Sequence, residues 1–180
     1  MLQPIGDKQT VVNVAEIRDH VRVDDGCDDL MLKSYINAAV DYCEGHTRRI
    51  IGRQQFRATF PGFKCIELPH PLTTLDSFRY YDKSGAQQDV PVSTYHLDRS
   101  TVPASLVLAD GKSWPETATR PDAVSVEVTA GDVPDSIRQA IYLLVGHWYA
   151  NREAVNVGQP AHEVPLAVES LLYPHRIYNL

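Results

Sequence analysis

Seven histidines and three cysteines are the residues of this sequence best suited to metal binding or catalysis, and their spacing matches no known site. The histidines are spread along the whole chain, and none forms a pair at metal-ligand spacing. The cysteines, Cys27, Cys43 and Cys65, are odd in number and lack a CxxC pair. This usage indicates no disulfide framework and is typical of a cytosolic, reducing origin. We therefore expect no metal and no cofactor, with the cysteines acting as small apolar side chains.

Local motifs for catalysis are absent as well. The sequence contains no GxSxG elbow, no HExxH pair and no P-loop. The acidic run 24–29 lacks the spaced ligands and closing glutamate of an EF-hand, so we interpret it as the solvated start of a helix. Because catalytic sets assemble in space, an enzymatic or ligand-binding domain with an unrecognised site stays as an alternative. A deep polar pocket holding two or more histidines with an acid would favour that alternative.

The net charge of the chain argues against a protein that binds nucleic acid tightly. The formal net charge is −6 and no basic block is present, whereas phosphate binding needs clustered lysine and arginine. A negative surface is nevertheless compatible with DNA that slides past it. A nucleic-acid-binding module that stacks bases on Tyr80, Tyr81 and Tyr95 is a further alternative. It would require a concentrated basic face made of Arg57, Lys64, Arg79, Lys83 and Arg99.

Two helical regions enclose the rest of the chain. Asn13 and Glu16 have the spacing of a capping box, which predicts a short helix from Val14 to about Arg22. A longer helix is predicted over residues 28–51, where apolar residues recur at steps of three and four. Beyond residue 131 the same period predicts a third helix to about Glu153. A last short helix is predicted to end before Pro174.

The sequence pattern in the middle of the chain predicts short strands. Alternating or β-rich segments are separated by prolines and turns over residues 53–131. The expected strands are 54–60, 64–68, 74–81, 87–92, 94–97, 105–108 and 123–129. The prediction is an α+β fold in which a mostly helical bundle forms the core. A small antiparallel β unit is inserted between the second and third helices.

The sequence predicts a single domain, 1–180, with a helical core at 11–52 and 133–175. The β-rich insertion is 53–131, and a C-terminal tail covers 175–180. Residues 1–9 have neither the basic start nor the apolar run of a signal peptide. No apolar stretch approaches the roughly 20 residues needed to cross a bilayer, so we expect no membrane partner.

Several segments together resemble the head–tail connector (adaptor) family of long-tailed phages and prophages. The most informative is Gly146–Glu153, GHWYANRE, at the end of an apolar helix. A Gly/Pro loop and the segment Val164–Arg176 follow it. The opening 15–24, the second helix 36–49 and the segments 68–72, 80–85, 111–124 and 133–141 are similar to the family as well. The likeness extends from about Val11 to Arg176.

The resemblance implies a non-enzymatic structural protein of the virion neck that is assembled in the host cytoplasm. It implies a homo-oligomeric ring of twelve copies that joins the portal protein to a tail-side neck or tail terminator protein. DNA would be only a passing cargo. No catalytic residue is carried over from the family.

A ring of identical subunits needs two different complementary faces on each copy. Tryptophan, tyrosine and arginine are enriched at interface hot spots, so we expect His147, Trp148, Tyr149 and Arg152 at or beside the subunit contact. The alternative for Trp148 is a plain core position. The amphipathic tail is expected to dock on the portal through Arg176, Ile177, Tyr178 and Leu180.

Overall fold

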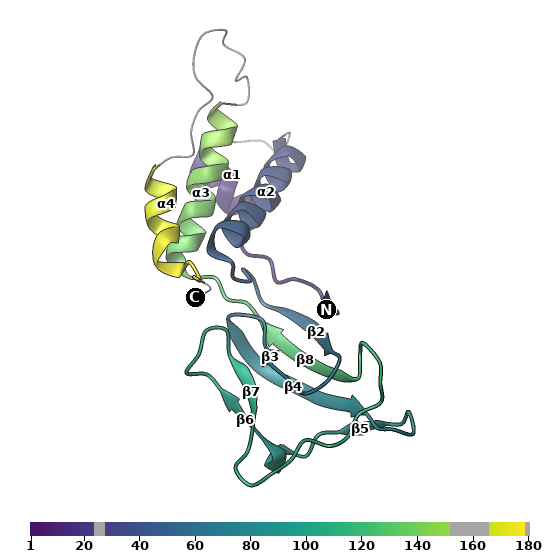
Figure 1. Ribbon diagram of the computed structural model, residues 1–180. Helices are drawn as coiled ribbons and strands as arrows, with labels where there is room; N and C mark the ends of the chain where they lie inside the picture. The colour runs from purple at the N-terminus through teal and green to yellow at the C-terminus, as the bar shows by residue number, and fades with distance from the viewer. Residues whose placement is uncertain (24–27, 152–165, 179–180) are drawn as a thin grey trace. The chain divides into compact units, whose positions relative to one another are not determined.

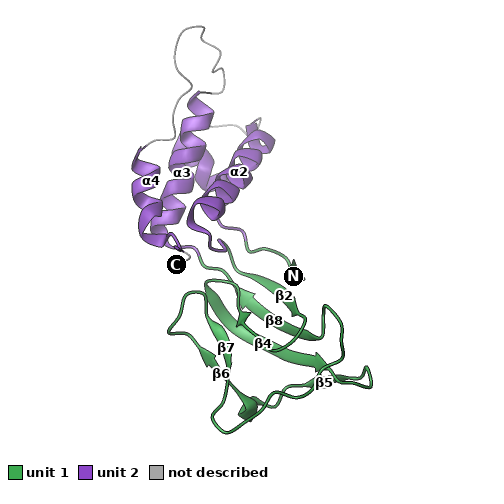
Figure 2. Ribbon diagram, in the orientation of Figure 1, with its two compact units in different colours: residues 1–9, 52–132 green, residues 10–51, 133–180 purple. Residues whose placement is uncertain are grey.

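The computed structural model describes residues 1–23, 28–151 and 166–178. The chain divides into two compact units (Figure 2). We call residues 1–9 and 52–132 the sheet unit, and residues 10–51 and 133–180 the helical unit. The chain passes between the units three times, at 9/10, 51/52 and 132/133. Within the sheet unit the passing segments are joined by main-chain hydrogen bonds, from Gln9 N to Arg53 O (2.8 Å) and from Gly52 N to Asp132 O (3.1 Å).

The sheet unit is built on a five-stranded antiparallel sheet (Figure 1). Its order is β1 (Leu2–Pro4), β2 (Gln54–Phe60), β8 (Val124–Ala130), β4 (Leu72–Tyr81), β5 (Gln87–Asp89). The central strand β8 alternates strictly, with Val124, Val126, Val128 and Ala130 buried. The residues between them lie on the opposite, polar face, because successive side chains of a strand point to opposite sides. The sheet therefore has one core face and one polar face.

A smaller sheet completes the sheet unit. Its three strands lie in the order β3 (Ile66–Glu67), β7 (Ser105–Leu108), β6 (Tyr95–Asp98). The short helix η2 (Val92–Thr94) directly precedes β6. Phe63 stacks on Trp114 with ring centroids 4.6 Å apart, and Phe78 packs edge-on against Trp114 and Tyr95. These aromatic rings belong to the packing of the unit.

The helical unit contains α1 (Val14–Val21), α2 (Asp29–Thr47), α3 (Asp135–Ala150), α4 (Leu166–Leu172) and the short helix η3 (Tyr173–His175). The predicted capping box is confirmed. The Asn13 side chain accepts a hydrogen bond from Glu16 N at 2.8 Å, and the Glu16 carboxylate accepts from Asn13 N. This exchange satisfies amides that the first helical turn would leave unpaired.

The core of the helical unit lies between its helices. The fully buried side chains include Leu32 and Cys43 of α2, Ile141 and Leu144 of α3, and Leu172 of α4. These positions follow the apolar stripes seen in the sequence, so neither helical half buries its stripe alone. Burial raises the pKa of the Cys43 thiol to about 12, with the Glu44 carboxylate adding to the effect, which keeps the thiol protonated and unreactive.

The predicted fold class is wrong in the proportions of helix and strand. The structure is a mixed α+β fold, 36% helical and 26% strand, with two antiparallel sheets, and its core is not a mostly helical bundle. Two local differences contribute. The second helix ends at Thr47 rather than at 51, because Arg48 adopts a left-handed conformation (φ 57°) and its N–H bonds Glu44 O. The N-terminal segment forms β1, an edge strand of the larger sheet.

No helix in the described ranges combines the length and apolar character needed to span a membrane.

Candidate interface surfaces

The end of α3 carries the first set of predicted interface residues. Trp148 is half-buried and packs edge-on against Tyr35 of α2, with ring centroids 6.2 Å apart. Tyr149 is also half-buried and donates its hydroxyl hydrogen to Asp28 Oδ2 at 2.6 Å. These contacts fix both aromatic side chains within the helical unit and leave part of each ring facing solvent. Arg152 lies outside the described residues.

His147 lies on the same turn of α3. Its carbonyl accepts a hydrogen bond from the Asn151 side chain at 2.8 Å, and its Nδ1 lies 3.4 Å from the Asn151 Nδ2. The imidazole is half-buried. The structure therefore brings His147, Trp148 and Tyr149 together on consecutive, partly exposed positions, and their role in a subunit contact stays a prediction.

The glycine before this group lies beside α1. A Cβ on Gly146 would lie 3.5 Å from His20 Nε2, an ordinary van der Waals contact, so the packing here does not require a glycine. His20 stacks on Tyr142, and the Tyr142 hydroxyl donates to Glu16 Oε2 at 3.0 Å. Burial raises the pKa of Tyr142, and its hydrogen bond to Glu16 adds to the effect. The GHWY motif thus lies where α3 packs beside α1, and its two aromatic residues are half-buried.

The C-terminal segment is anchored to the helical unit. His175 Nε2 lies 2.6 Å from Ser136 Oγ of α3, and its Nδ1 lies 3.3 Å from Arg49 Nη1. Since a guanidinium only donates hydrogen bonds, this arrangement assigns the acceptor role to Nδ1 and the proton to Nε2. Ile177 N donates to Thr47 O at 2.9 Å. Sequence reasoning missed Ser136 and Arg49, because no local signal links them to His175.

This anchoring displays a small aromatic and cationic cluster, made of Tyr173, Arg176 and Tyr178. The two tyrosines are 65% and 55% exposed and lie edge to face, with centroids 6.4 Å apart. The Arg176 guanidinium carbon lies 5.4 Å from the centre of the Tyr178 ring. Leu180 lies outside the described residues. The side chains that do face solvent here are of the types found at interface hot spots.

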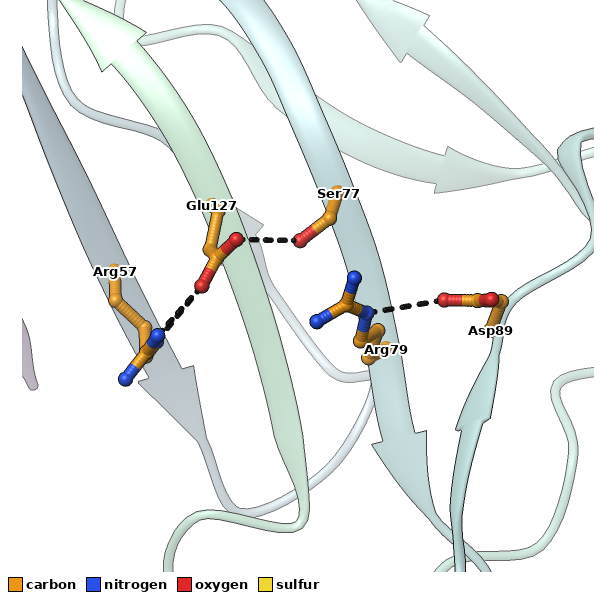
Figure 3. Close-up of polar contacts among 5 residues, drawn as sticks. All are labelled: Arg57, Ser77, Arg79, Asp89 and Glu127. Atoms are coloured by element: carbon orange, nitrogen blue, oxygen red, sulfur yellow. Dashed lines mark hydrogen bonds and ion pairs between the residues drawn. The ribbon is translucent and has the colours of Figure 1, made fainter.

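The polar face of the larger sheet carries a row of paired charges (Figure 3). Glu127 of β8 accepts two hydrogen bonds from Arg57 of β2, at 2.7 and 3.0 Å, and one from Ser77 of β4 at 3.1 Å. Arg79 of β4 donates to Asp89 of β5 at 3.1 Å. The hydrogen bonds from Arg57 hold the pKa of the Glu127 carboxyl below its usual value, against the opposing effect of burial, and Ser77 adds to the lowering. Glu127 is therefore ionised at neutral pH, and its stabilising contribution is lost as the pH falls through this lowered pKa.

The nucleic-acid-binding alternative is not supported by this geometry. Of its five basic residues, Arg57, Arg79 and Lys83 are paired with carboxylates, and Arg99 donates to the carbonyls of Leu72 and Thr73. Tyr95 packs on Phe78, and Tyr81 lies under the Arg120 guanidinium at 3.9 Å. The tyrosines that would stack bases therefore make intramolecular contacts.

Two hollows on the described part of the chain do not match the pocket that the enzymatic alternative requires. One hollow of about 420 Å³ is lined by Pro61 and residues 117–121. A second, of about 500 Å³, is lined by residues 6–9, 53–55 and Thr129. Neither contains a histidine, whereas the alternative requires two or more with an acid.

Comparison with solved structures favours the structural interpretation. The chain matches no protein-family model and no curated protein. Its fold is similar to a chain from the neck of an empty gene transfer agent (GTA) particle computed with C6 symmetry, at TM-score 0.75 and 25% identity. It is similar to chains from the virion of the native GTA particle (TM-score 0.75, 27% identity) and from the native neck computed with C12 symmetry (0.72, 25%). Each match covers 100% of this chain and 97% of the other.

The predicted likeness to head–tail connectors is confirmed. Because the match covers the whole chain, the sheet unit belongs to this neck-protein fold as much as the helical unit does. The surfaces described above are therefore surfaces of a neck-type subunit.

Proposed function

We propose that this chain is a structural subunit of a virion neck, which forms a ring between the portal and the tail and lets DNA pass through. The observation that carries the proposal is the likeness to neck chains of GTA particles over 100% of the chain. In this role the protein is not an enzyme, because its work is to bind copies of itself and the neighbouring neck components.

The ring is a head-to-tail assembly of identical copies. The necks of the similar GTA chains were computed with C6 and C12 symmetry, which supports a homo-oligomeric ring, and we propose twelve copies. Each subunit then presents two different faces to its two neighbours. We place His147, Trp148 and Tyr149 at one of these faces, because fixed and partly exposed aromatic residues lose little conformational entropy on binding.

The C-terminal segment is the proposed contact with the portal. His175 and Ile177 hold it against the helical unit, so Tyr173, Arg176 and Tyr178 are ordered before binding. Preordering reduces the entropy lost on association. The opposite end of the ring receives the tail-side neck or tail terminator protein.

Paired charges suit a ring through which DNA slides. Unpaired cations raise the affinity for phosphates. In the sheet unit Arg57, Arg79 and Lys83 each have a carboxylate partner, and the net charge of the chain is −6. Such a subunit gives passing DNA few sites at which to bind.

A double substitution of Arg176 and Tyr178 to alanine tests the portal contact. We expect attachment of the ring to the portal to weaken by about 30-fold or more, since one hot-spot residue contributes about 2 kcal/mol or more and about 1.4 kcal/mol corresponds to tenfold. Ring formation should be unchanged. Co-sedimentation of the purified protein with portal rings measures both.

A matched control is the double substitution Arg120→Ala and Tyr81→Ala, which removes a cation–π pair from the sheet unit. This control should bind the portal normally. Normal binding by the Arg176/Tyr178 variant would remove the C-terminal segment from the portal contact.

Deleting the gene in cells that produce the particles tests the proposed function itself. We expect heads that lack tails, because the ring that receives the tail is missing. Complementation with a tagged copy should restore tails, and electron microscopy should locate the tag at the neck. Tailed particles from the deletion strain, or particles without the tagged chain, would contradict the proposal.

A further inference from the structure

The N-terminal strand is attached to the sheet through main-chain groups. Thr59 N donates to Met1 O at 2.8 Å, and Ile5 N donates to Gln55 O at 3.0 Å. All three residues of β1 are exposed, so its side chains contribute little to the core. The attachment therefore depends on main-chain N–H and C=O groups. The β1 strand of another copy of the protein carries the same groups and could form the same hydrogen bonds.

The segment that follows β1 joins it to the helical unit. Residues 7–10 are exposed, and Val11 and Val12 are buried in the helical core. Hydrogen bonds from Gln9 N to Arg53 O at 2.8 Å and from Gln54 Nε2 to Gly6 O at 2.7 Å also hold this segment to the sheet unit. β1 is thus a short strand on an exposed linker whose far end is fixed.

A strand and the sheet edge that accepts it are two different, complementary surfaces. A closed ring of identical copies needs two complementary surfaces on each copy. Exchange of β1 between neighbouring copies would supply them, because the contacts that β1 makes with its own chain would be replaced by the same contacts with a neighbour. Each copy would give its strand to one neighbour and receive a strand from the other. The main-chain hydrogen bonds between β1 and β2 would then be made again between chains, whereas the bond from Gln9 N to Arg53 O would be released.

We infer that β1 of one subunit pairs with β2 of the next subunit in the assembled ring. This inference rests on the proposed ring. In the single chain, β1 covers its own β2 edge, which prevents uncontrolled edge-to-edge pairing before assembly. Exchange brings Met1, Leu2 and Ile5, which are 80%, 47% and 42% exposed in the single chain, to the boundary between copies.

A cysteine pair across the two strands reports which chain supplies β1. Leu2 and Ala58 are directly opposite, between the hydrogen-bonded positions Met1–Thr59 and Gln3–Arg57. Such pairs have Cα atoms about 4.5 Å apart, within the range of a disulfide. The variant Leu2→Cys with Ala58→Cys is made together with Cys27→Ser and Cys65→Ser, which removes the exposed Cys65 and the further cysteine Cys27.

Particles carrying this variant are purified, oxidised and run on a non-reducing gel. Exchange predicts a ladder of linked chains from the particles and a single-chain band from oxidised monomer. Monomer oxidised before assembly should join tailless heads about tenfold less well than reduced monomer, because its strand is locked to its own sheet.

The matched control places cysteines at Arg79 and Asp89, an opposed pair on β4 and β5 that cannot exchange. It should give single-chain bands from particles and from monomer. A single-chain band from particles that contain the Leu2/Ala58 variant at the neck would overturn the exchange alone. Absence of the chain from particles would instead overturn the proposed function.

Discussion

Replacing Trp148 by alanine is expected to abolish ring assembly while leaving a folded monomer. The side chain is half-buried and packs on Tyr35, so its loss should lower the free energy of unfolding by less than the about 3–5 kcal/mol of a fully buried tryptophan. A hot-spot truncation weakens each interface by about 2 kcal/mol or more, and every interface of the ring carries it. Negative-stain imaging measures assembly, and far-UV circular dichroism measures folding.

Trp114 provides the control for this experiment. It stacks on Phe63 within the sheet unit, so Trp114→Ala also removes a partly buried tryptophan but leaves the proposed contact residues of α3 unchanged. This variant should lose some stability and still form rings. If Trp148→Ala gives an unfolded monomer, Trp148 is a core residue and its assignment to the subunit contact is wrong.

Replacing Ile141 by alanine is expected to destabilise the helical unit by about 2–5 kcal/mol. Ile141 is fully buried on α3, in the core that α3 forms with the other helices. The variant removes apolar surface and leaves a cavity, which together account for the expected loss. Urea unfolding followed at 222 nm measures it, because the helices dominate that signal.

The conservative variant Ile141→Val distinguishes packing from a general effect of substitution. It removes one methylene group and should lower the free energy of unfolding by about 0.5–1.5 kcal/mol. Equal losses for the two variants, or no loss for alanine, would contradict the position of Ile141 in the core.

Local patterns predicted the helices well because the signals are contained within each element. Asn13 and Glu16 are three residues apart, and the capping box they predict is present. The stripe that includes Ile137, Ile141 and Leu144 is buried as its period indicates. The end of α2 was missed because an arginine, rather than the usual glycine, adopts the left-handed conformation at Arg48.

The balance between helix and sheet was harder to predict. The strands were expected in nearly their observed places, yet short segments do not reveal that β2, β8 and β4 pair into one large sheet. β1 was missed because three exposed residues have no periodicity, and only its main-chain bonds to β2 define it.

The candidate interface residues were also predictable only where the signal is local in the sequence. Trp148, Tyr149 and Tyr178 were chosen by residue type, and the structure shows them partly exposed or exposed. The anchor of the C-terminal segment was not predictable, since Arg49 and His175 are 126 residues apart in the chain. Contacts between residues so far apart in the chain can be identified only from the packed three-dimensional structure.

The repeated passage of the chain between its two units has a mechanical consequence. A pull that separated the units would be carried by several covalent segments in parallel, at 9/10, 51/52 and 132/133. The hydrogen bond from Gly52 N to Asp132 O ties two of these segments side by side, so they share the tension. A pull on such a subunit is shared among three covalent segments, whereas a single linker would carry all of it.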